Sequence, residues 1–96
     1  ATVKHPSAVQ NYTEEGVNIS CYPNPASDYV VISGEQLSGF QQGRADLFNI
    51  SGQRIRSVEL KDNQTTMNMN DLSAGAYLLM IWNGEKQVKA VKIVKE

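Results

Sequence analysis

The sequence has one cysteine and one histidine, and this scarcity excludes several kinds of site chemistry. Cys21 has no second cysteine with which to form a disulfide in this chain. No histidine and cysteine cluster has the spacing of metal ligands. His5 lies in a segment without a periodic pattern, so a nucleophile–base pair with Cys21 has little support. The sequence therefore predicts no catalytic residue, no metal and no cofactor, and Cys21 is best interpreted as a small buried apolar side chain.

Long apolar runs and an excess of one charge are also missing. The longest unbroken apolar run covers residues 76–82, too short for a membrane-spanning helix. No basic segment followed by an apolar run opens the sequence, so we expect no signal peptide in it. The formal net charge of −1 gives no electrostatic basis for binding nucleic acid. What is present is a chain of 96 residues, 41% of them hydrophobic, as suits one small globular domain.

Turn residues recur about every eight to twelve positions from residue 17 onward, which is typical of an all-β protein. We expect about seven short strands, at residues 17–22, 29–33, 44–50, 53–60, 65–70, 76–82 and 85–96. Residues 34–43 read as a loop with one turn of helix around Leu37. Residues 1–16 are interpreted as a linker that can contribute a short strand, and residues 17–96 as the folded domain.

Two hairpins and one irregularity are expected among these strands. Gly52 supplies a positive φ between residues 44–50 and 53–60, and Asn83-Gly84 is a strong two-residue hairpin signal. Ile55 falls out of phase with Val58, which predicts either a bulge or a strand that changes sheets near Arg56 and Ser57.

The last two strands carry unusual patterns. Residues 76–82 are apolar on both faces, so this strand is either covered on both sides or exposes a contact patch. The final segment repeats valine every third residue, as a helix can, but its β-branched content favours a strand. Lysines along it (Lys86, Lys89, Lys92 and Lys95) suit an edge strand, to which another protein can pair.

A rigid segment, "YPNPASD" at residues 22–28, separates two of the expected strands. Proline lacks the N–H that a sheet needs and restricts the residue before it to extended geometry. Pro23 and Pro25 therefore predict a stiff segment with little capacity for strand pairing, standing as a hinge at the entrance to the domain.

The order of four motifs resembles the C-terminal sorting domain of the type IX (Por) secretion system, type A. "YPNPASD" with the strand after it resembles the opening motif of that family. "DLFNISGQRI", "MNMNDLSAGAYLLMI" and "KQVKAVKIVKE" are similar to its later motifs, in the same order. The resemblance covers residues 19–96, ending at the terminus, where the family ends its polypeptides.

This resemblance implies an immunoglobulin-like antiparallel β-sandwich and a non-catalytic role in protein export. Domains of this family, in bacteria of the Bacteroidetes type, carry an N-terminally fused cargo from the periplasm across the outer membrane. Their partners are the outer-membrane translocon, shuttle proteins and a sortase-like cysteine protease. The protease removes the domain, here within or before residues 1–16, and the cargo stays at the cell surface on anionic lipopolysaccharide or becomes extracellular.

By position, the family motifs place the recognition residues at Pro23, Asn24, Pro25, Gly52, Gly75, Tyr77, Lys92 and Lys95. Pairing of two copies through an exposed edge strand is also considered. Two other hypotheses stay open from the residues alone. One is an adhesion or carbohydrate-binding module that stacks sugars on Tyr29, Tyr77 and Trp82. The other is a thiol enzyme built on Cys21.

Overall fold

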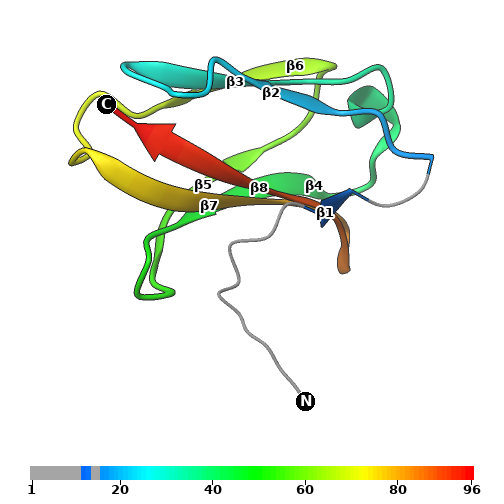
Figure 1. The fold of residues 1–96 in the computed structure, drawn as a ribbon. Coiled ribbons are helices and arrows are strands. Elements are labelled where there is room, and N and C mark those ends of the chain that lie inside the picture. Colours follow the sequence, from blue (N-terminus) through cyan, green and yellow to red (C-terminus); the bar gives the residue numbers. More distant parts are fainter. Residues whose placement is uncertain (1–11, 14–15) are drawn as a thin grey trace.

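Two antiparallel sheets face each other in the computed structural model, which describes residues 12–13 and 16–96 (Figure 1). The first sheet has the order β1-β8-β7-β4-β5 and the second the order β2-β3-β6. The strands are β1 (Tyr12–Thr13), β2 (Ser20–Tyr22), β3 (Tyr29–Ser33), β4 (Gly43–Phe48), β5 (Arg54–Glu59), β6 (Gln64–Asn68), β7 (Gly75–Asn83) and β8 (Lys86–Lys95). A 3-10 turn, η1 (Leu37–Gly39), links β3 to β4. The predicted all-β sandwich is confirmed.

The core lies between the sheets because alternate residues of each strand point inward. The five-stranded sheet contributes fully buried side chains such as Leu47, Leu79 and Ile81, and the smaller sheet contributes Val30, Ile32 and Met67. Burial of each such side chain stabilises the fold by about 1.5–3 kcal/mol. Leu37 on η1 is also fully buried, so the expected helical turn closes one end of this core.

Most strand positions match the sequence patterns, and the differences are local. β3 has the predicted bounds, whereas β2 starts three residues later than expected. The register of β4 and β5 shifts between Leu47 and Phe48, which leaves Ile55 as the extra residue. The bulge is therefore present, just before the predicted place. The turn between β7 and β8 consists of Gly84 and Glu85, one residue later than Asn83-Gly84, because Asn83 still pairs with Lys86.

The interpretation of β8 as an edge strand is wrong. One side of β8 pairs with β7 over its whole length, and the other side pairs with β1 at Lys89 and Ala90. Residues from the proline segment occupy that second side further along, at Lys92 to Glu96. The edge strands of the described chain are instead β1 and β5 in the larger sheet and β2 and β6 in the smaller one.

Candidate functional site

The proline segment lies against the last residues of β8, although it connects β2 to β3 of the other sheet. Asn24 donates a hydrogen bond from Nδ2 to the Lys92 carbonyl at 2.8 Å. Its Oδ1 accepts one from the Val94 N–H at 3.0 Å. The primary amide thus offers one donor and one acceptor, as a neighbouring strand does.

Ala26 continues this pairing with its own backbone. Its N–H donates to the Val94 carbonyl at 2.7 Å, and its carbonyl accepts from the Glu96 N–H at 2.8 Å. These bonds form a short parallel bridge to Lys95. Ala26 is fully buried, whereas Pro23, Asn24 and Pro25 are exposed. We call residues 23–26 together with residues 92–96 the clamp.

The clamp corrects the interpretation of the proline segment as a hinge at the domain entrance. Both peptide bonds before the prolines, Tyr22-Pro23 and Asn24-Pro25, are cis. The segment connects two strands of the smaller sheet and reaches the end of β8 in the larger one, and Figure 1 shows the carboxyl end of β8 rising toward it. Prolines cannot donate to a ladder, so the amide of Asn24 and the backbone of Ala26 make these bonds instead.

The two candidate lysines lie on opposite sides of β8. Lys92 is exposed and pairs in register with Leu78, on the face turned away from the smaller sheet. Lys95 pairs in register with Gly75, and its Nζ donates to the Glu96 carbonyl at 3.0 Å. The clamp therefore brings five of the predicted recognition residues together: Pro23, Asn24, Pro25, Lys92 and Lys95.

Tyr77 and Gly75 lie at the start of β7, where local contacts and backbone conformation explain why a tyrosine and a glycine occupy these positions. The Tyr77 hydroxyl donates to the Ser73 carbonyl at 2.6 Å, and the ring is 8% exposed. A tyrosine that bonds back to the preceding loop is a known corner feature of immunoglobulin-like sandwiches. Gly75 has a φ of +147°, a conformation that side-chain-bearing residues rarely adopt.

Gly52 lies apart from the clamp, in the turn between β4 and β5. Its φ is +87°, and its N–H donates to the Asn49 carbonyl at 3.0 Å. The Asn49 side chain also accepts hydrogen bonds from the N–H groups of Ser51 and Gln53. This turn holds Ile50 at its tip with 85% of its surface exposed.

The three aromatic residues considered for sugar stacking do not form one platform. Tyr77 is in the core, Tyr29 is exposed on the smaller sheet, and Trp82 lies on the larger sheet in register with Arg44. Side chains on different sheets, or on opposite faces of one sheet, cannot stack on one sugar, so the carbohydrate-binding hypothesis loses the arrangement on which it depended.

Cys21 packs against the core as expected, but it is partly buried rather than fully buried. Burial raises the pKa of its thiol to about 11, and the positive charge of Lys89 opposes this only in part. A thiol with a raised pKa is a poor nucleophile at neutral pH. His5, the other member of the considered pair, lies outside the described residues, as do most of residues 1–16. Within the described ranges, no three His, Cys, Asp or Glu side chains are grouped to hold a metal, and no helix has the length and hydropathy to cross a membrane.

Sequence reasoning missed Ala26, Val94 and Glu96, whose backbone groups complete the clamp. Backbone N–H and carbonyl groups are the same in nearly every residue type, so the sequence could not identify these positions individually. The available signal was Asn24 itself: between two residues that lack an N–H, its amide is the group that can pair with a strand edge.

Comparison with known families adds to this geometry. Residues 20–96 match the family described as "Secretion system C-terminal sorting domain". No curated protein matches the chain. Members of this family are generally non-catalytic, and they take a cargo fused at their N-terminus to the type IX secretion machinery for export to the outer membrane or cell surface. The chain therefore belongs to the C-terminal sorting domains of the type IX secretion system.

Proposed function

We propose that the clamp is the surface by which the type IX machinery recognises this sorting domain. The exposed part of the clamp carries the two proline rings, the Asn24 amide and the Lys92 side chain. Outer-membrane translocon and shuttle proteins bind this surface while the attached cargo is in the periplasm. Gly52, Gly75 and Tyr77 support the fold that presents it, through the turn and corner contacts described above.

The observation that carries the proposal is the pair of hydrogen bonds from Asn24 to Lys92 and Val94. The first and last motifs of the family lie 68 to 70 residues apart in the chain, and these bonds place them side by side. A receptor that reads both motifs at once distinguishes a folded domain from an unfolded one, because the combined surface exists only after folding.

After export, a sortase-like cysteine protease cuts within or before residues 1–16 and leaves the cargo anchored at the cell surface. This step rests on the family and on the division of the chain into a linker, 1–16, and a domain, 17–96. The position of β1 bears on it: Tyr12 and Thr13 pair with β8, so a cut upstream of them leaves the sheet intact.

Paired substitutions test the role of the clamp. Asn24→Ala removes two side-chain bonds to the backbone of β8, and Asn49→Ala removes two bonds to the backbone of an unrelated turn. Each change costs about 1–3 kcal/mol of stability, because each lost bond contributes about 0.5–1.5 kcal/mol. Thermal unfolding of the two variants establishes that the losses are comparable.

The readout is the location of the cargo when each variant is introduced into the parent protein in its native host. We expect Asn24→Ala to hold the cargo in the periplasm and Asn49→Ala to release it to the surface. Equal export of the cargo by the two variants would contradict the proposed role of the clamp in recognition. The same fractions report cleavage, since an exported cargo that keeps its domain contradicts the protease step.

A further inference from the structure

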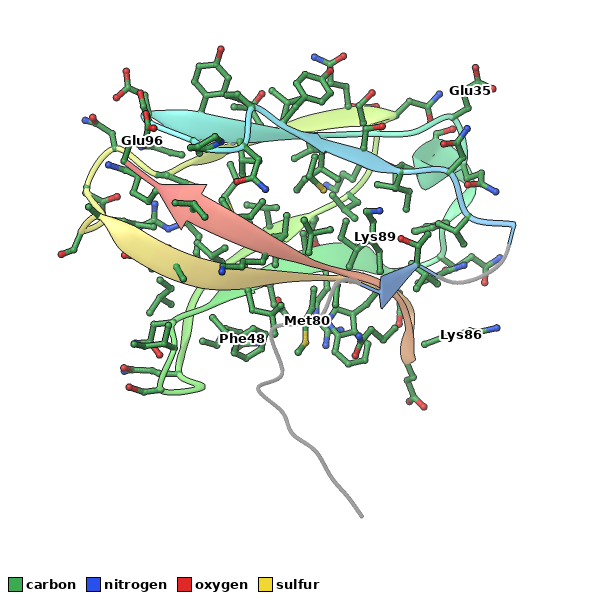
Figure 2. The ribbon with its side chains drawn as sticks, viewed as in Figure 1. Glu35, Phe48, Met80, Lys86, Lys89 and Glu96 are labelled. Carbon is green, nitrogen blue, oxygen red and sulfur yellow. The ribbon has the colours of Figure 1, made fainter. Side chains whose placement is uncertain are left out.

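Strand β7 carries large apolar side chains on the face that points away from the smaller sheet. Leu78, Met80 and Trp82 lie on this face, and Phe48 of β4 pairs in register with Leu78. Figure 2 shows Phe48 and Met80 directed away from the smaller sheet. All four side chains are partly exposed. We call this set the outer patch.

An antiparallel sheet with one solvated face normally places polar residues there. β7 instead alternates two apolar sets, and the second sheet covers only the inner set, which includes Leu79 and Ile81. In Figure 1 the β4–β5 and β7–β8 connections bend toward the outer side of the larger sheet. Partly exposed large apolar side chains that are grouped on one face in this way are typical of a protein contact.

Positive charge borders the outer patch. Asp46, only 2% exposed, accepts hydrogen bonds from Arg44 Nε at 3.0 Å and from Ser57 Oγ at 2.7 Å. A second guanidinium, that of Arg54, lies 4.0 Å from the same carboxylate. The two arginine side chains are 41% and 57% exposed and share a single buried negative charge. One positive charge is therefore left uncompensated at the surface.

Two neighbouring features strengthen this charge pattern. The Arg44 guanidinium lies 5.1 Å from the centroid of the Trp82 ring, so it is held over the apolar patch. Lys92, in register with Leu78, adds a further cation to the same face. The carboxylate of Glu59 also belongs to this face but is paired with Lys61 at 3.3 Å.

We propose that the outer patch is a second docking surface, which binds a component of the export machinery whose contact area is apolar at its centre and carboxylate-bearing at its rim. This inference rests on the proposed function. A second copy of the chain fits less well, because a two-fold contact through the outer patch would bring together two surfaces with the same excess of positive charge. Complementary charge favours an acidic partner instead and speeds its association.

The test places opposite charges at the centre of the patch in the full-length parent protein. Met80→Glu puts a carboxylate against an apolar, acid-rimmed partner, and Met80→Lys puts an ammonium group there. Tyr29→Glu is the control, because Tyr29 is exposed on the outer face of the smaller sheet. We expect Met80→Glu to reduce surface cargo at least about tenfold, Met80→Lys to reduce it less, and Tyr29→Glu to leave it unchanged. Thermal unfolding of each variant chain checks that it is folded.

A photo-crosslinking amino acid at position 80, with position 29 as its control, identifies the occupant. Capture of a type IX component from position 80 supports the proposal. Capture of a second copy, or of residues 1–11 of the same chain, overturns it, as does normal export of folded Met80→Glu. Deletion of residues 17–96 distinguishes failure of the proposed sorting function from failure of the outer-patch proposal. If the cargo is still exported after this deletion, the sorting function is refuted. If the deletion blocks export but the Met80→Glu variant exports its cargo normally, only the role of the outer patch is refuted.

Discussion

The side chain of Asn24 accepts a hydrogen bond from the backbone N–H of Val94, a residue 70 positions further along the chain. Its Nδ2 donates to the Lys92 carbonyl, so one amide satisfies the strand on both sides of Ile93. Through this contact the smaller sheet holds the end of the last strand of the larger sheet. The covered edge is also protected from pairing with other chains, a general need of exposed strands.

Replacement of Tyr77 by phenylalanine should weaken the fold without changing the core. The substitution removes the hydroxyl that donates to Ser73 and keeps the ring. We expect a loss of about 0.5–1.5 kcal/mol in the free energy of unfolding, measured by urea titration. Tyr29→Phe, at a ring that is 47% exposed, should change it by less than about 0.5 kcal/mol. Equal losses of stability in the two variants would show that the hydrogen bond from Tyr77 to Ser73 does not explain the tyrosine at position 77.

Alanine substitutions at two glycines should measure the cost of backbone strain where no steric clash occurs. A Cβ added at Gly52 or at Gly39 meets no atom within 4 Å, but only Gly52 of the two has a positive φ. Gly52→Ala should therefore cost about 1–2 kcal/mol, and Gly39→Ala should be neutral or slightly stabilising. Thermal unfolding of both variants tests this, and a neutral Gly52→Ala would show that the turn adopts another conformation.

The Cys21 thiol should react slowly in the native protein. Its pKa is about 11 when folded and 9.0 without burial, so its thiolate fraction near pH 8 is lower by about two powers of ten. Alkylation by iodoacetamide should lag behind that of the urea-unfolded chain by at least this factor. Comparable rates would contradict the burial of the thiol.

The same group makes stability depend on pH in an alkaline window. The folded pKa lies above the unfolded one, so the contribution is complete below pH 9.0 and is lost as the pH rises toward 11. Cys21→Ser should remove this part of the alkaline loss of stability. We also expect the Cys21→Ser variant to send its cargo to the surface normally. That result would exclude the thiol-enzyme hypothesis, which requires the thiol.

The Arg56–Asp71 pair should contribute to stability only above acidic pH. Arg56 donates to both carboxylate oxygens of Asp71, at 3.1 and 3.0 Å, and these bonds lower the pKa of Asp71 from its ordinary 3.8. A lowered pKa gives stabilisation above pH 3.8 that is lost as the pH falls through the folded value. The stability difference between wild type and Arg56→Gln should therefore shrink on acidification. Lys61→Gln, which breaks the exposed pair with Glu59, should show little difference at any pH.

Much of the strand content follows from the sequence because its causes are local. Alternation over a few residues identified β3 and β6, a short run that is apolar on both faces identified β7, and glycine at positive φ marked the turn at Gly52. The bulge near Ile55 was visible as a break in that alternation. Four motifs in order were also enough to indicate the family, since they require no knowledge of which strands are neighbours.

Strand neighbours were decided by the tertiary structure. The lysines of β8 suggested an edge, yet β1 and the clamp cover that side, because pairing depends on segments far away in the chain. The same holds for the aromatic residues. Tyr29 lies on the smaller sheet, and Tyr77 and Trp82 lie on opposite faces of β7 in the larger one.

The sequence by itself therefore determined the fold class, most strand positions and the family, since period-two alternation and turn geometry act over a few residues. Only the tertiary structure decided that the first and last motifs form one surface, and that the second apolar set of β7 faces outward. Both outcomes depend on which strands pair and in what register. The burial of many side chains at once fixes that register, and no short stretch of sequence records it.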